Sequence, residues 1–347
     1  MRIESLDIKK IIKKTKEDRN FHGVVSVSQD NQLIFGKGYG YANRNQKNNN
    51  TLNTRFGIAS GCKIFTAVAI CQLVQKGLIS FDTMLNDCLD ISFPNFDSDI
   101  TINHLLTHTS GILDYFDESV MDNYEALWDD IPMYKMKNCN DFLPLFQNNK
   151  MKFSPGEKFD YNNAGYILLG LIIEQQTGMK FQDYIQKNIF DVCNMDDSGY
   201  FSLDKLPERC AHGYIENEEN NIWRTNVYSI PIIGGPDGGA FVTALDITKF
   251  WKALFDNRLL DKNTTEKLLT PQAESGDDCY YGFGVWVTKK EGKIYKYCIM
   301  GRDPGVSFRS SIYIDNNIQV NVLGNTNWGG YAITNRIEEE LIKTIYY

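Results

Sequence analysis

The residues most able to do chemistry are Ser60 and Lys63, in the segment Ser60-Gly61-Cys62-Lys63. At the start of a helix, side chains three residues apart share one face, so this hydroxyl and this amine can meet. A helix N-terminus offers backbone N–H donors and a positive potential, which stabilise an oxyanion and disfavour a second positive charge. An uncharged lysine there can take the serine proton, so the pair predicts a nucleophile and its base.

The four-residue spacing is a weak signal alone, because Ser202-Leu203-Asp204-Lys205 repeats it in a stretch that we interpret as a surface loop. Ser60 differs in its context: a strongly apolar helical pattern begins directly after it. The structural alternative for Ser60 is an N-cap residue, and that role is compatible with a nucleophile.

A second candidate is Tyr161, in a Tyr-Asn-Asn tripeptide between a Pro-Gly turn and an apolar helical pattern. A phenol at a helix entrance can face a groove, and a nearby cationic lysine favours its phenolate, which suits a proton shuttle. Asn163 is expected to donate to a substrate carbonyl. The tripeptide at 41–43 has the same spacing, and a half-buried aromatic is the structural alternative for Tyr161.

The elements that must position these residues fall into a clear order. Helical periodicity covers 60–76 and 163–177, and helices are expected near the N-terminus, from Ile3 to Ile12, and at about 332–345. Strand patterns cover 23–28, 33–39, 282–288, 293–298, 308–314 and 318–323. They predict an α/β (α+β) fold in which N- and C-terminal strands form one antiparallel sheet, flanked by the terminal helices. We expect residues 1–80 and 205–347 to form a discontinuous sheet domain, residues 81–204 a mostly helical domain, and the active site to lie in the groove between them.

Composition excludes several classes of function. The net charge of −8 argues against a nucleic-acid partner. The sequence contains no run of about 18 apolar residues, so we expect no transmembrane segment. The N-terminus lacks the apolar core of a signal peptide, so we expect a cytoplasmic protein unless a leader has been trimmed from the sequence. The eight cysteines and four histidines lack ligand-like spacing, so we expect no metal. The glycines at 234–239 lack a phosphate-loop pattern and predict a tight turn near the groove.

Five longer stretches resemble the serine β-lactamase-related family of penicillin-binding proteins, which includes class C β-lactamases, D-alanyl-D-alanine carboxypeptidases and related esterases. They lie at 56–82, 102–112, 153–170, 234–250 and 301–308, in the family's order. This resemblance implies a β-lactamase/transpeptidase-like fold and a reaction without cofactor or metal.

The resemblance also assigns roles to residues. Ser60 matches the nucleophile of the SxxK motif, Lys63 its lysine, and Tyr161 and Asn163 the Tyr-x-Asn motif. The oxyanion hole would combine the backbone N–H of Ser60 with the backbone near Gly301 and Arg302. The same resemblance places His104 and His108 in a structural stretch that packs and caps a helix.

One motif departs from the family. Ile299-Met300-Gly301 stands where the family has Lys-Thr-Gly or His-x-Gly. The glycine still lets backbone approach a ligand closely, but the cationic or titratable side chain is lost. Arg302 is the candidate to supply a positive charge instead.

We therefore expect a serine hydrolase that forms an acyl-enzyme on an ester or amide, with β-lactamase-like, D-Ala-D-Ala carboxypeptidase-like and esterase activities as alternatives. Its substrate would be a small-molecule ester, amide, β-lactam or D-amino-acid peptide. The altered third motif motivates a second hypothesis, a non-catalytic protein of the same fold that binds or senses a ligand. The sequence makes no prediction of oligomeric state.

Overall fold

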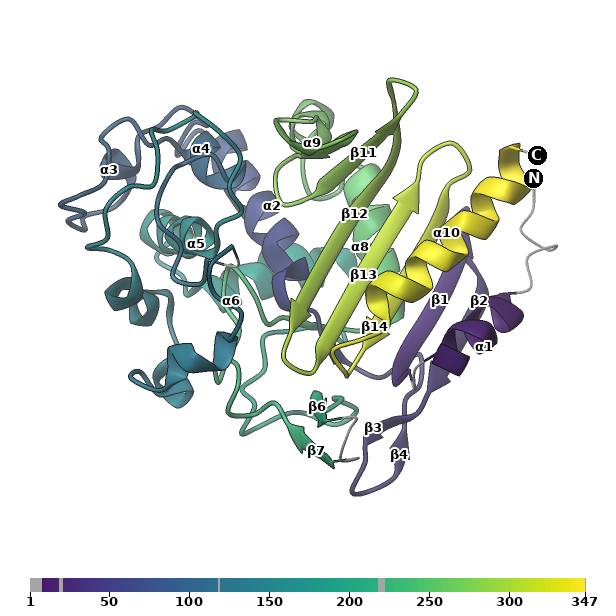
Figure 1. Ribbon diagram of the computed structural model, residues 1–347. Coiled ribbons are helices and arrows are strands. Elements are labelled where there is room, and N and C mark those ends of the chain that lie inside the picture. The colour runs from purple at the N-terminus through teal and green to yellow at the C-terminus, as the bar shows by residue number, and fades with distance from the viewer. Residues whose placement is uncertain (1–7, 19–20, 118, 218–221, 347) are drawn as a thin grey trace.

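The computed structural model describes residues 8–18, 21–117, 119–217 and 222–346, and it is built around one eight-stranded antiparallel sheet (Figure 1). The strand order is β2-β1-β14-β13-β12-β11-β10-β9. The strands are β1 (Gly23–Gln29), β2 (Gln32–Tyr39), β9 (Ala273–Gly276), β10 (Cys279–Tyr281), β11 (Trp286–Lys290), β12 (Lys293–Asp303), β13 (Val306–Tyr313) and β14 (Ile318–Gly324). The two ends of the chain meet in the sheet, where β1 pairs with β14 from Gly23↔Gly324 to Gln29↔Ile318.

Both faces of the central strands are covered, so β13 and β14 are buried at every position instead of alternating. On one face lie the terminal helices α1 (Ile8–Asp18) and α10 (Gly330–Tyr346) (Figure 1). Their apolar stripes pack on the sheet through Ile8, Ile12, Ile333, Ile337 and Leu341. Ile3 and Leu6, which the sequence also assigns to the first helix, lie outside the described residues.

On the other face lie α2 (Lys63–Gln75) and α8 (Ala244–Phe255), with α9 (Lys262–Leu269) beside them (Figure 1). Helix α2 is apolar on all sides because it runs between the sheet and the helical middle of the chain, and ten of its residues are buried. This packing holds Lys63, the first residue of α2, in a fixed position.

The middle of the chain is helical and irregular. It contains α3 (Leu85–Cys88), α4 (Ile102–Leu106), α5 (Asn163–Thr177), α6 (Phe181–Ile185) and α7 (Asp191–Cys193), with short helical turns η3 (Tyr124–Trp128), η4 (Met133–Lys135), η5 (Cys139–Leu145) and η6 (Gln186–Phe190). Short ladders outside the main sheet pair β3 (Tyr41–Asn43) with β4 (Asn48–Asn49), β5 (Phe56–Gly57) with β8 (Phe241–Val242), and β6 (Tyr214–Asn217) with β7 (Ile222–Thr225).

The predicted fold class is confirmed, and the differences concern two additional strands and the ends of the predicted ones. Strands β9 and β10 extend the sheet beyond the six predicted strands. The stretch predicted as a strand from 282 begins only at Trp286, because Gly284 takes a left-handed conformation with φ 71°. Strand β12 continues past 298 to Asp303, because β13 pairs with it that far. The proposed division into two domains stays a prediction.

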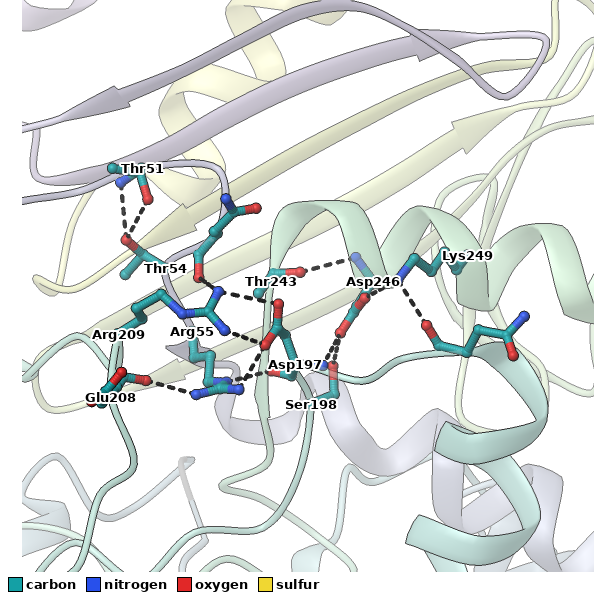
Figure 2. A network of polar contacts seen from close by, with 12 residues as sticks. Thr51, Thr54, Arg55, Asp197, Ser198, Glu208, Arg209, Thr243, Asp246 and Lys249 are labelled. Carbon is teal, nitrogen blue, oxygen red and sulfur yellow. Dashed lines mark hydrogen bonds and ion pairs between the residues drawn. The ribbon is translucent and has the colours of Figure 1, made fainter.

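A network of charged groups fixes the segment that leads into Ser60 (Figure 2). Arg55 contacts the carboxylate of Asp197 at 2.6 Å, and Arg209 contacts the same carboxylate at 2.5 Å. Asp246, near the start of α8, accepts from the backbone N–H of Asp197 at 3.0 Å. These contacts tie residues just before β5 to the region after α7, so the entry to the 60–63 turn is held by distant parts of the chain.

No helix among the described residues is both long enough and apolar enough to cross a membrane.

Candidate active site

Ser60 lies in a helical turn, η2 (Ala59–Cys62), immediately before α2. Its Oγ is 3.0 Å from Nζ of Lys63, the first residue of α2. The side chain of Ser60 is partly exposed, whereas Lys63 is 1% exposed. A hydroxyl open to a ligand therefore rests against an amine that is screened from bulk water.

Ser60 is not the N-cap residue that its sequence context also allowed. Ile58 and Cys62 occupy the cap positions of η2 and α2, and neither caps with its side chain. Ala59, just before the serine, has a φ of 46°, which is uncommon for a residue with a Cβ. This bend leaves the serine hydroxyl free of a capping bond and available to Lys63.

Lys63 has two further contacts, both with atoms that can only accept hydrogen bonds. Its Nζ lies 2.8 Å from Oδ1 of Asn163 and 2.6 Å from the backbone oxygen of Asp237. An unprotonated amine has two N–H donors and one lone pair. If the donors serve Asn163 and Asp237, the lone pair is left for the hydroxyl of Ser60, which is the arrangement a general base needs.

The orientation of the Asn163 amide is set by Asp114. Asn163 Nδ2 donates to one oxygen of Asp114 at 2.8 Å, and the backbone N–H of Ala164 donates to the other at 2.8 Å. With its Nδ2 turned to Asp114, Asn163 must present Oδ1 to Lys63. Burial raises the pKa of Asp114 to about 7, and burial also raises the pKa of Asp237.

The raised pKa of Asp114 predicts a pH dependence of stability. The fold disfavours the ionised form of Asp114. The stability that protonated Asp114 contributes is therefore complete below pH 3.8, its ordinary pKa, and is lost as the pH rises through about 7. In urea titrations, the free energy of unfolding of wild type relative to Asp114→Asn should therefore fall across this window, by up to roughly 4 kcal/mol.

Asp117 supplies a control of the opposite kind. Its hydrogen bond with Lys152 holds the pKa of Asp117 below its ordinary value, so above about pH 5 it is ionised in both the folded and the unfolded chain. Asp117→Asn should change the free energy of unfolding by a constant amount there. A constant difference for Asp114→Asn as well would contradict the assignment.

Tyr161 lies directly before α5, whose N-cap is Asn162, and its ring borders the same lysine. Nζ of Lys63 is 5.0 Å from the centroid of the Tyr161 ring. The ring stacks on Trp286 with centroids 6.1 Å apart and planes 14° apart, and it lies 4.4 Å from the imidazole of His108. These neighbours fix the phenol at the edge of a cavity that Ser60 also lines.

The histidines have structural contacts. His104 completes a capping box on α4, with its Nδ1 accepting from the backbone N–H of Thr101 at 3.2 Å. His108 Nδ1 accepts from the backbone N–H of Asn162 at 3.1 Å. Burial, and then the charge of Lys63, hold the pKa of His108 well below its ordinary value. A neutral His108 thus serves as a wall behind Tyr161.

Strand β12 passes directly over the nucleophile. A Cβ built on Gly301 would lie 2.0 Å from the Ile58 carbonyl oxygen and 2.8 Å from the Ser60 backbone nitrogen, so only glycine fits there. The pairing of β11 with β12 runs only to Trp286↔Cys298. Residues 299–303 therefore pair with β13 on one side and leave their other edge next to Ser60.

The altered third motif has a clear structural meaning. Ile299 is 1% exposed and belongs to the main apolar core, so it adds no polar group to the site. Met300 and Arg302 line the cavity that Tyr161 borders, and Arg302 is exposed.

Ser60 lies where two cavities meet. One, of about 300 Å³, is lined mainly by apolar and aromatic residues, with Asn163 and Asp237 on its wall. The other, of about 780 Å³, is bordered by Tyr161, Trp286 and the β12 edge. Arg302 lines both. A substrate carbonyl at Ser60 can thus place one substituent in each cavity.

The structure brings Ser60, Lys63, Asn163, Tyr161, Gly301 and Arg302 to one site. Sequence reasoning missed Asp114 and Asp237. Asp237 contacts Lys63 through a backbone oxygen, which has no sequence signature, but it sits in the 234–239 glycine turn that the sequence places near the groove. The second Ser-x-x-Lys segment is a turn in which the Ser202 hydroxyl donates to Asp204.

The chain is similar to known proteins in sequence and in fold. The model of the family described as Beta-lactamase matches residues 8–341. The chain is 30% identical over 328 residues to penicillin-binding protein 4* of Bacillus subtilis (strain 168), covering 89% of this chain and 69% of that protein. A solved penicillin binding protein from Bacillus halodurans has a TM-score of 0.91 and 49% identity over 96% of this chain and 99% of that one. The D-amino acid amidase of Ochrobactrum anthropi SV3, solved with L-phenylalanine amide, shares the fold with a TM-score of 0.77 and 22% identity over 97% of this chain and 99% of that one.

Proposed function

Because the chain belongs to the beta-lactamase family, we propose that it is a serine hydrolase in which Ser60 forms an acyl-enzyme with an ester or amide. The observation that carries this proposal is the 3.0 Å contact between Ser60 Oγ and Lys63 Nζ, with both other contacts of Lys63 made to obligate acceptors. β-Lactams and peptides that end in a D-residue are the candidate substrates, together with simple esters.

In the acylation step, the lone pair of Lys63 takes the hydroxyl proton as Ser60 Oγ bonds to the substrate carbonyl carbon. The carbonyl oxygen becomes an oxyanion, for which the backbone N–H groups of Ser60 and Arg302 are the proposed donors. The close approach of β12 to Ser60 at Gly301 supports this pairing. The bond to the leaving group then breaks, and the leaving group takes a proton from the Lys63 and Tyr161 pair.

Water completes the reaction by attacking the acyl-enzyme, and it passes its proton to the same pair as the Ser60 ester bond breaks. Asn163 acts as a positioning group for Lys63, and its second amide N–H is the proposed donor to a substrate carbonyl. The third motif of this chain lacks a positive charge. Arg302, on the exposed edge of β12, supplies that charge and binds a substrate carboxylate.

Covalent labelling tests the proposal. Wild-type protein treated with a fluorophosphonate should gain the mass of one adduct, and peptide mapping should place it on Ser60. Parallel assays with a short-chain p-nitrophenyl ester and a chromogenic cephalosporin separate esterase from β-lactamase activity. No adduct and no turnover of either compound would favour the rival hypothesis of a ligand-binding protein, which the apolar Ile299 motivates.

Tyr161→Phe should slow acylation by about 10²–10⁴-fold, the usual size of a general acid–base contribution, because the ring stays in place and only the hydroxyl is lost. Stopped-flow measurement of ester acylation gives the rate. Tyr41→Phe is the matched control, since that exposed tyrosine begins the similar tripeptide at 41–43 and should change the rate less than about twofold. A loss below about threefold for Tyr161→Phe would remove its phenol from the mechanism.

A further inference from the structure

One buried carboxylate in the site has no role in the reaction proposed above. Asp237 is 7% exposed and lines the smaller cavity with Ser60. Its backbone oxygen accepts from Lys63, and its carboxylate accepts from the hydroxyl of Tyr115. Within the described part of the chain, no lysine, arginine or histidine forms an ion pair with that carboxylate.

A buried carboxylate is costly unless its charge is fully compensated. Transfer of a charge from water into a protein interior is unfavourable unless a partner of opposite charge accompanies it. The cost is visible at Asp237, where burial raises the pKa of the carboxyl. The charge of Lys63, the hydroxyl of Tyr115 and the backbone N–H groups of Asp237 and Gly238 lower this pKa again, but they offset the burial only in part. A cation that entered the cavity would supply the remaining stabilisation.

The rest of the cavity has the chemistry of a site for an organic cation. Its wall includes Tyr115, Phe116, Tyr124 and Phe142. Phe116 and Tyr124 lie 4.9 Å apart between centroids, and Tyr115 and Phe142 lie 5.6 Å apart. Aromatic rings attract ammonium groups, most strongly where water is excluded, and they also bind the apolar carbons beside such a group.

The charges around the cavity point in the same direction. The lining of the smaller cavity contains two carboxylates, those of Asp237 and Asp303, and one guanidinium, that of Arg302. Arg302 also lines the larger cavity. An anion would meet the buried carboxylate of Asp237 directly, whereas a cation would meet its opposite charge there.

We propose that the smaller cavity binds a protonated amine on the acyl part of the substrate, with the carboxylate of Asp237 as its partner and the aromatic wall around its apolar neighbours. The preferred substrates are then amides or esters of amine-bearing acids. That the bound amine belongs to a substrate rests on the proposed function. Binding of an amine in this cavity needs no chemistry at Ser60, so the proposed function and the amine site can fail separately.

Calorimetric titration at neutral pH compares D-phenylalaninol with 3-phenyl-1-propanol, which has the same carbon frame without the amine. Wild type should bind the amine at least about tenfold more tightly, the size expected for a desolvated charge pair. In Asp237→Asn the two affinities should agree within about twofold, whatever the variant does to binding in general. Repeating the titration with L-phenylalaninol gives the stereochemical preference.

Two further variants are the controls. Tyr115→Phe keeps the carboxylate and should keep the preference for the amine. Asp303→Asn removes the other acid of the lining and should keep it as well. Equal affinity of wild type for the amine and the alcohol would overturn the proposal without any variant. A preference that survives in Asp237→Asn, or one lost only in Asp303→Asn, would overturn the assignment to Asp237.

Discussion

Ser60→Ala should abolish covalent labelling and lower the acylation rate at least about 10⁴-fold, because the nucleophilic oxygen beside the Lys63 amine is removed. The melting temperature should stay close to that of wild type. The Ser60 side chain caps no helix and is only partly buried, and Lys63 keeps its contacts with Asn163 and the Asp237 backbone oxygen when the hydroxyl is lost. Intact mass after fluorophosphonate treatment and differential scanning calorimetry measure the two effects.

The chain carries its own control for this experiment. Ser202→Ala removes the serine of the second Ser-x-x-Lys segment, which lies in a turn and bonds Asp204. That variant should label as wild type does. An adduct of unchanged stoichiometry on Ser60→Ala would place the nucleophile elsewhere and would end the proposal of acylation at this site.

Lys63→Met should lower the acylation rate about 10³–10⁴-fold, because methionine fills a similar volume but cannot take a proton. Unlike Ser60→Ala, it should also destabilise the fold. It leaves Asn163 Oδ1 and the Asp237 backbone oxygen without their donor in a buried place, at about 1–3 kcal/mol each. Urea titration gives the free energy of unfolding, and stopped-flow ester acylation gives the rate.

Lys205→Met is the matched control, because this lysine is exposed in the second Ser-x-x-Lys segment and should change neither quantity measurably. If Lys63→Met acylates within about tenfold of wild type while its stability falls, Lys63 is a structural cation and the base lies elsewhere.

The predictable part of the site is the part that short-range geometry determines. Ser60 and Lys63 are one helical turn apart, so their contact follows from spacing once a helix starts there. Helix α5 likewise has the predicted bounds 163–177, because an apolar run lies between a capping asparagine and a glycine that ends the helix with a φ of 67°. The terminal strands and helices follow from their hydrophobic periods.

The parts that escaped prediction depend on atoms without a sequence signature. The Asp237 contact with Lys63 uses a carbonyl oxygen that any residue possesses. Asp114 acts through the orientation of an amide 49 positions away, and only the fold places them together. The consequence of Ile299 also depends on the fold. The strand is complete, but Ile299 is buried in the apolar core at the position where the family motif has a titratable group.

The pairing of β1 with β14 has a consequence for synthesis of the protein on the ribosome. The first strand of the sheet, at Gly23, finds its neighbour only when the chain has been made to Gly324. The strand that passes over the reactive serine, β12, is also made long after that serine. Such long-range pairing makes folding slow and late. A nascent or prematurely terminated chain would therefore carry the serine and lysine without the backbone that completes an active centre, and reactivity would arise only after β12 and β14 have been made.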